Sequence, residues 1–223
     1  MVNLTQYSAA NLFAEAHVDS EKWNQLPPDN EVAQTIEGIA RRGIAVVRAR
    51  NGKIALEILK DLIPPEAEVM HGSSTTLVEI GYEAYVNSDE SRWKDLHRAI
   101  IAENDEEKRR ALRRKSVTAD YFISGVNAIA RSGEIVACDR SGSRVGAWPY
   151  AAVHLILVSG TNKLAPTLDD AVRRVWEYAY PLENVRAKRA YGAPSQIGKC
   201  VILANEEIEG RVTLILIDES LGY

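Results

Sequence analysis

The sequence has 223 residues, of which 46% are hydrophobic and 26% are charged, and its net charge is −4. A chain of this length and composition buries a large core, so we expect a soluble globular protein without extensive disorder. The slightly acidic balance argues against a nucleic-acid surface. The first residues resemble neither a secretory signal nor a membrane span, so the cytoplasm is the expected location.

The chain contains two cysteines, Cys138 and Cys200. They form no Cys-x-x-Cys pair, so the residues predict neither an iron–sulfur cluster nor a structural zinc site, and we expect no metal and no cofactor. In the cytoplasm both thiols stay reduced. The spacing leaves a disulfide between them open.

Hydrophobic periodicity in the first third of the chain predicts helices and strands in alternation. Residues 1–28 are interpreted as an N-terminal arm with a short helix at 9–16, and residues 29–223 as one domain. The elements expected next are a helix at 31–42 capped by Asp29 or Asn30, a strand at 44–49, a helix at 53–63 and a strand at 67–70.

A small polar loop, from His71 to Thr76, follows that strand and leads into a helix at Leu77. Serine and threonine at a helix start can cap it, and the free N–H groups there can also hold a phosphate or carboxylate. No lysine follows as a Walker loop requires, which argues against an ATPase.

Residues 90–115 contain two charged helical stretches. The second ends in a basic run from Arg109 to Lys115, which acidic residues precede and no aromatic residue interrupts. This pattern favours a solvated helix face over a nucleic-acid site.

The segment from Ser116 to Ala147 has the pattern of a site. A strand at 117–123 and a strand at 134–138 are bounded by turns of small residues, at Ser124-Gly125, at Gly133 and at 141–143. Glycine turns let a ligand approach the main chain, and unpaired N–H groups attract anions. The alternative is that these are ordinary turns between strands.

The rest of the chain continues the alternation of strands and helices. The expected elements are a buried strand at 153–159, a helix capped by Thr167 that buries Trp176, a charged helix at 182–192, and strands at 199–204 and 211–218 that we interpret as a candidate antiparallel pair. The alternation predicts an α/β fold with a largely parallel central sheet flanked by helices. Ligands bind beyond the carboxyl ends of such strands, so the loops after residues 70, 123, 138 and 158 are expected to converge.

Four motifs together resemble the LUD, or lactate-utilisation, domain family, and in particular its lactate-utilisation C proteins. They are HGSSTTLVEIG, TADYFISGVNAIARSGEIV with DRSGSRVGA, VSGTNKLAPTLDDAVRRVWEYAYPLENVRAKR, and RVTLILIDESLGY. The resemblance covers the chain from about residue 30 onward. It implies the fold of ribose-5-phosphate isomerase, glucosamine-6-phosphate deaminase and CoA transferases, and it also implies a link to oxidation of L-lactate to pyruvate through an iron–sulfur complex.

The resemblance also implies partners and ligand residues. The expected partners are a small anion (a carboxylate, a phosphate or a CoA ester), an iron–sulfur lactate-utilisation subunit, and a second copy of the chain by analogy with the fold. No nucleic acid and no membrane is expected. The residues carried over to four ligand loops are Gly72, Ser73, Ser74 and Thr75; Ser124, Gly125 and Asn127; Asp139, Ser141, Gly142, Ser143 and Arg144; and Ser159, Gly160, Asn162 and Lys163.

The second loop departs from the related isomerases. Ser124 and Asn127 stand where those enzymes have an Asp-Gly-x-Asp loop, and neither can act as a carboxylate base. The remaining candidates for acid–base work are Asp139, which can instead cap the turn that follows it, and Glu134 as the second choice.

Other polar side chains have more than one reading. Arg144 is expected to grip an anion bidentately and Lys163 to supply a compact charge. Cys138 is interpreted as a buried thiol rather than a nucleophile, and His71 either shuttles protons or is a satisfied core histidine.

Three functions stay open from the sequence: an accessory protein of organic-acid oxidation that binds an anion or a partner subunit, a stand-alone isomerase-like or transferase-like enzyme acting on a phosphorylated or acyl-CoA substrate, and a non-catalytic interaction domain.

Overall fold

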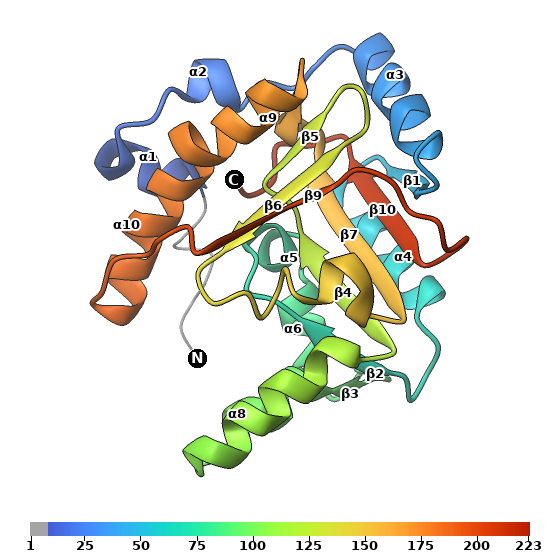
Figure 1. The fold of residues 1–223 in the computed structure, drawn as a ribbon, viewed down its shortest axis with the longest axis vertical. Helices are drawn as coiled ribbons and strands as arrows, with labels where there is room; N and C mark the ends of the chain where they lie inside the picture. Colours follow the sequence, from blue (N-terminus) through green and yellow to red (C-terminus); the bar gives the residue numbers. More distant parts are fainter. Residues whose placement is uncertain (1–8) are drawn as a thin grey trace.

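The structure, a computed structural model, describes residues 9–223; the first eight residues of the expected N-terminal arm lie outside the described residues. Its centre is a sheet of six parallel strands (Figure 1). In spatial order the strands are β1 (Ala45–Ala49), β10 (Val212–Ile217), β7 (His154–Gly160), β4 (Tyr121–Gly125), β2 (Glu68–His71) and β3 (Lys94–Asp95).

A second, smaller sheet packs against the first. Its strands, in spatial order, are β8 (Leu164–Ala165), β5 (Ala128–Ala130), β6 (Ile135–Asp139) and β9 (Lys199–Leu203). β6 runs antiparallel to both β5 and β9, whereas β5 and β8 are parallel. The two closing strands therefore lie in different sheets, and they form no hairpin with each other. The α/β class with a largely parallel central sheet is confirmed.

The central strands are buried on both faces because their apolar side chains alternate. Leu155 and Leu157 of β7 contact a core shared with the smaller sheet, whereas Ile156 and Val158 contact a second core on the opposite face. Helices that cover the first face include α3 (Asp29–Ala40) and α7 (Leu96–Ala102); the second face is covered by α4 (Gly52–Leu62), α5 (Thr75–Glu79) and α6 (Tyr82–Val86). The basic helix α8 (Glu106–Lys115) lies at the lower end of Figure 1 and buries no residue.

A long helical segment covers the outer face of the smaller sheet. It begins as α9 (Leu168–Arg174), passes through a π-helical turn (Val175–Ala179) and continues as α10 (Tyr180–Tyr191). Trp176 was expected on its buried side but is 52% exposed. The π turn breaks the 3.6-residue period on which that expectation rested, and Tyr178 is buried instead.

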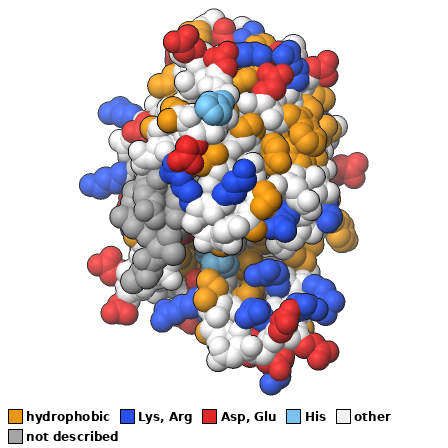
Figure 2. All heavy atoms as spheres, turned by 90° about the vertical axis from the view of Figure 1, so that its left-hand side faces the viewer, with side chains coloured by type: hydrophobic (Ala, Val, Ile, Leu, Met, Phe, Trp, Pro, Cys, Tyr) orange, Lys and Arg blue, Asp and Glu red, His pale blue; other side chains and the backbone are white. Residues whose placement is uncertain are grey.

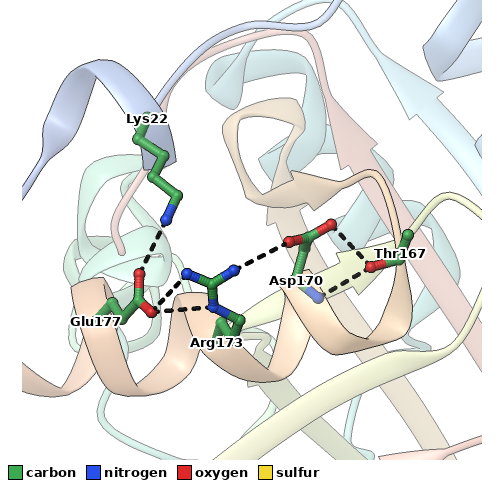
Figure 3. A network of polar contacts seen from close by, with 5 residues as sticks. All are labelled: Lys22, Thr167, Asp170, Arg173 and Glu177. Atoms are coloured by element: carbon green, nitrogen blue, oxygen red, sulfur yellow. Dashed lines mark hydrogen bonds and ion pairs between the residues drawn. The ribbon is translucent and has the colours of Figure 1, made fainter.

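Part of the N-terminal arm packs on this helical segment. Helix α1 (Ala9–Ala16) buries Leu12 against α10, and α2 (Ser20–Trp23) buries Trp23 in the same core. On the surface, Lys22 forms an ion pair with Glu177, which in turn pairs with Arg173 (Figure 3).

Local signals placed several helix starts and missed others. Ser74 and Thr167 accept the backbone N–H bonds that cap α5 and α9, as expected, and Asn51, which the sequence analysis did not single out, does the same for α4. Helix α3, in contrast, begins at Asp29 itself, after Pro28 as an uncapped N-cap residue, so the expected cap by Asp29 or Asn30 is wrong.

The central segment also differs in detail from the expected pattern. The strand expected at 117–123 is β4, shifted to Tyr121–Gly125 after a 3₁₀ turn at Ser116–Thr118. Ser124 and Gly125 therefore belong to the strand rather than to a turn. A short strand, β5, stands between them and β6.

Candidate functional site

A cleft of about 400 Å³ lies beside the carboxyl ends of β2 and β6. Because the central strands are parallel, β2 and β4 end at the same edge of the sheet, as expected. Walls of the cleft come from the first and third predicted loops, from α7 and α8, and from α10 with Tyr223. The predicted ligand residues that line it are Gly72, Ser73, Asn127, Asp139, Ser141, Ser143 and Arg144.

The Arg144 side chain crosses from the third loop to the end of β4. Its Nη1 donates to the carbonyl oxygen of Gly125 and, at 3.3 Å, to Ser124 Oγ. Its Nη2 donates to the carbonyl oxygen of Cys138 and, at 3.1 Å, to Asn127 Oδ1. Both terminal nitrogens are thus engaged, so the bidentate grip expected from the sequence is not open to a ligand. What Arg144 offers is a positive charge that only neutral oxygens solvate.

Two glycines make this packing sterically feasible. A Cβ at position 72 would stand 2.5 Å from Arg144 Cδ, and a Cβ at position 125 would stand 2.3 Å from Ser74 Oγ. Real Cβ atoms essentially never lie this close to a heavy atom of another residue. Gly72 therefore admits the arginine, and Gly125 lets the first loop close over the end of β4.

Asp139 shapes the third loop. Its carboxylate accepts the backbone N–H groups of Gly142, Arg144 (2.9 Å) and Val145 (3.1 Å). These three bonds correspond to the turn-capping alternative considered for Asp139. They also hold Arg144 in place, because its own backbone is one of the donors.

His71 forms part of the inner wall of the cleft, at the end of β2. It is only 2% exposed, and neither ring nitrogen has a hydrogen-bond partner among the described residues. The His97 ring lies beside it, tilted by 51°, with ring centroids 4.4 Å apart. Asp95 Oδ1 lies 3.9 Å from Nε2 of His71. Burial lowers the pKa of His71 to about 3 and also lowers the pKa of His97, so both imidazoles are neutral near pH 7.

Two arginines that the sequence patterns did not select line the same cleft. Arg113 projects from α8 and Arg140 from the third loop. Both are exposed, and neither guanidinium has a hydrogen bond or ion pair with another described residue. Arg113 belongs to the basic run that the sequence placed on a solvated helix face. Arg113 lines the cleft because the fold places α8 beside the third loop, and the sequence around Arg113 does not show this contact.

The fourth loop does not reach the cleft. Lys163 is 2% exposed, and its Nζ donates to Thr76 Oγ1 (2.8 Å) and to the carbonyl oxygen of Val126 (3.0 Å). Burial lowers the pKa of Lys163 well below its ordinary value, and the neighbouring Arg174 acts in the same direction. An anion in the cleft therefore does not contact Lys163.

The last residues of the chain fill the space above Lys163. Asn162 accepts the N–H of Leu221 (3.1 Å), and Glu79 accepts the N–H of Gly222 (2.6 Å). A Cβ on Gly222 would lie 3.3 Å from Lys163 Nζ. The fourth loop, together with Glu79 at the end of α5, thus binds the chain's own backbone where the sequence predicted a ligand.

The other predicted residues are also placed outside the cleft. Ser124 and Ser159 are buried, and each donates its hydroxyl to the carbonyl of the next residue, Gly125 or Gly160. Thr75 lines a separate small pocket with Ser74, and Gly142 lines a shallow surface pocket beside α8.

Glu134 is held elsewhere. Its carboxylate pairs with Arg42 and accepts the hydroxyl of Ser132. It is not among the residues that line the cleft, so the structure does not bring together the two carboxylates, Asp139 and Glu134, that the sequence put forward.

No helix between residues 9 and 223 is both long and apolar enough to cross a membrane. Within the same range, no group of three or more His, Cys, Asp or Glu side chains is arranged to hold a metal ion.

Comparisons with known proteins identify a family. The model of the LUD domain matches residues 32–217, which is most of the chain. Agroclavine dehydrogenase from Claviceps purpurea is 29% identical over 93 residues, which is 40% of this chain and 32% of that protein. The chain thus matches about a third of the length of that curated relative. A crystal structure of a DUF162 family protein from Deinococcus radiodurans aligns with 86% of this chain and 98% of its own, at 13% identity and a TM-score of 0.49.

Proposed function

This chain belongs to the LUD domain family, and we propose that it is an accessory protein of L-lactate or related organic-acid oxidation whose cleft binds a small organic anion. The family associates the chain with lactate utilisation at a general level. The observation that carries the proposal is that, among the described residues, the Arg113 and Arg140 guanidinium groups at the cleft have no hydrogen-bond or ion-pair partner.

Charge in the cleft favours an anion. Its two acidic side chains are already engaged: Asp139 by three backbone N–H groups, and Glu183 by Arg186 and the Tyr223 hydroxyl. Arg113 and Arg140 have no such partners within residues 9–223. Their guanidinium groups present the fork of donors that suits a carboxylate or a phosphate.

Figure 2 views the molecule from the left-hand side of Figure 1. Lys and Arg side chains gather at the lower end of this face, together with acidic ones, over the part of the molecule where α8 lies. The basic run of α8 begins only after its acidic first turn, and three of its basic residues, Arg113, Arg114 and Lys115, occupy the last turn. The last turn of α8 is the part that meets the third loop, because Arg113, Arg114 and Ser143 line one shallow surface pocket.

The size of the cleft restricts the ligand. A volume of about 400 Å³ is at the lower end of the range for small-molecule sites. A lactate-sized acid fits with ordered water, whereas only one end of a CoA ester would enter. The neutral rings of His71 and His97 supply hydrogen-bonding groups beside the charged rim without adding charge of their own.

One observation favours the second candidate, an isomerase-like or transferase-like enzyme. His71 has two unpartnered ring nitrogens at the wall of the cleft, which is where a proton-transfer group would be needed. If the protein is an enzyme of this kind, His71→Asn is expected to abolish turnover of a phosphorylated or acyl-CoA substrate and to leave the binding of that substrate intact.

The test of the binding proposal is calorimetric titration of the purified protein with L-lactate, pyruvate, a sugar phosphate and acetyl-CoA, with a thermal-shift series as a second readout. A ligand at 100 times its dissociation constant adds about 2.7 kcal/mol of stability. We expect a carboxylate to bind and the double variant Arg113→Ala/Arg140→Ala to lose that binding. Arg114→Ala is the control for the Arg113 half of this variant, because it removes one positive charge one residue along α8 at a position that does not line the cleft.

Retention of full affinity in the double variant would refute the proposed site. Binding of the sugar phosphate or acetyl-CoA alone, with turnover that depends on His71, would favour the enzyme. The accessory role has its own test, which is co-purification with a cysteine-rich iron–sulfur subunit.

A further inference from the structure

The two cysteines of the chain lie directly opposite each other on neighbouring strands. Cys138 of β6 and Cys200 of β9 are partners in the antiparallel register, between the pairs Ala137–Val201 and Asp139–Lys199. Side chains of such partners leave the sheet on the same face. Both thiols are free.

Backbone bonding shows which kind of antiparallel pair they form. The Cys138 N–H donates to Asn127 Oδ1 (3.0 Å), and its carbonyl oxygen accepts from Arg144 Nη2. Asn127 directly precedes β5, the neighbour of β6 on the side away from β9. Both backbone groups of Cys138 therefore point away from β9.

A residue whose backbone groups turn away from the neighbouring strand forms a non-hydrogen-bonded pair with it. Such pairs bring the Cα atoms to about 4.5 Å, closer than the alternate pairs of the ladder. Disulfides span Cα separations of roughly 4.4 to 6.8 Å. The two cysteines thus meet the distance requirement, and β9, at the edge of its sheet, has a neighbour on one side only among the strands that the structure describes.

The two thiols differ in exposure and acidity. Cys200 is exposed, whereas Cys138 is half-buried at the wall of the cleft. Burial raises the pKa of Cys138 to about 12 and also raises that of Cys200. Cys200 is therefore the thiol that a reagent from solution reaches first.

We propose that Cys138 and Cys200 are a redox-responsive pair that forms a cross-strand disulfide by exchange with a low-molecular-weight disulfide. The Cys200 thiolate attacks one sulfur of the small disulfide, whose S–S bond breaks and releases one small thiol. Cys138 then gives up its proton and attacks the Cys200 sulfur, which breaks the mixed disulfide and releases the second small thiol. Two protein thiols are oxidised and one small disulfide is reduced to two thiols.

The bond is expected to form slowly near neutral pH and faster at alkaline pH, because both thiols are weaker acids than a free cysteine and the thiolate is the reactive form. The disulfide forms at the wall of the cleft, because Cys138 lines the cleft. The carbonyl oxygen of Cys138 is also one of the four oxygens that hold Arg144.

The test treats the purified full chain with oxidised glutathione across pH 7 to 9 and follows intact mass and non-reducing peptide maps. We expect a product that has lost two hydrogen atoms, contains one peptide cross-linked between positions 138 and 200, and returns to the free thiols on addition of dithiothreitol. Cys138→Ser should stop at a mixed disulfide on Cys200, and Cys200→Ser should react far more slowly.

A geometric control moves one thiol by a single residue. In Cys200→Ser/Val201→Cys the new thiol leaves the opposite face of β9, so no intramolecular bond to Cys138 should form. A wild-type product with glutathione on Cys200 and a free thiol on Cys138 would overturn the proposal, as would dimers linked through Cys200. Disulfide formation in the shifted variant would equally overturn it, because the pair geometry would then be irrelevant.

Discussion

Gly72 and Arg144 are in contact across the mouth of the cleft, and the contact exists only because Gly72 has no side chain. An added Cβ would stand 2.5 Å from Arg144 Cδ and 2.9 Å from its Cγ. The arginine cannot simply swing aside, because both of its terminal nitrogens are bonded to oxygens of β4, β6 and the residue that precedes β5.

Gly72→Ala should therefore destabilise the fold and disturb the cleft together. Displacing Arg144 forces a shift of the third loop, and overpacking of this kind costs about 1 to 3 kcal/mol. Urea unfolding measures the stability, and ligand titration measures the cleft. Ser73→Ala is the control for stability alone, since position 73 already carries a Cβ and its side chain lines the cleft. Wild-type stability and affinity in Gly72→Ala would mean that the loop yields without cost.

The free energy of unfolding should decrease as the pH is lowered, because His71 takes up a proton more readily in the unfolded chain. Its folded pKa of about 3 lies below the value of about 6.5 expected for the unfolded chain, so the unfolded state binds more protons between these values. The contribution is complete above pH 6.5 and is lost as the pH falls toward 3, up to about 4 kcal/mol. Burial shifts His97 in the same direction.

The measurement is the free energy of unfolding in urea from pH 7 to pH 4, for the wild type and for His71→Asn. The variant cannot take up the proton, so its stability should fall less steeply over this range. Equal slopes in both proteins would show that the His71 ring is not held neutral by burial.

Arg174 should be among the most costly residues to replace. It is 1% exposed and donates to the carbonyl oxygens of Trp23 (3.0 Å), Asn127 and Asn162 (3.4 Å). Arg174→Met fills the volume but leaves three buried carbonyls without donors, and we expect a loss of about 3 to 5 kcal/mol. Denaturant unfolding measures it.

Arg173→Met is the matched control for Arg174. The neighbouring Arg173 lies at the surface, where it pairs with Glu177 and Asp170 (Figure 3) and its guanidinium stands 6.0 Å from the centroid of the Trp23 ring. Such solvated contacts contribute little, so its loss should leave the unfolding midpoint almost unchanged. If both variants unfold alike, the buried bonds of Arg174 are worth no more than surface ones.

The N-terminal arm should dock through Trp23 and hardly at all through Lys22. Trp23 is 7% exposed in a core with Leu12 and Leu182, so Trp23→Ala is expected to cost about 3 to 5 kcal/mol. Lys22 pairs with Glu177 at the surface, and its Nζ lies 4.2 Å from the centroid of the Trp23 ring. Both contacts are exposed to solvent, so Lys22→Ala should change stability little. Limited proteolysis within residues 9–28 is the second readout: it should accelerate in Trp23→Ala and stay slow in Lys22→Ala.

The sequence by itself determined the class of fold and most of the element positions. Apolar runs such as the one at β7 mark strands buried on both faces, and Ser74 and Thr167 mark helix starts, because capping and side-chain periodicity act over a few neighbouring residues. Local signals failed where the backbone leaves its regular geometry. The three-residue strand β5 is too short to show a period, and the π turn moves Trp176 to the surface.

Only the tertiary structure decided which polar residues share a site. The four small loops do follow strands, but the chain's last residues fill the space over Lys163, and Glu134 pairs with Arg42 far along the sequence. Conversely, Arg113 on α8 and Arg140 in the third loop meet at one cleft although 27 positions separate them. A side chain's neighbours across the fold depend on strand order and packing, and no pattern confined to a short stretch of sequence carries that information.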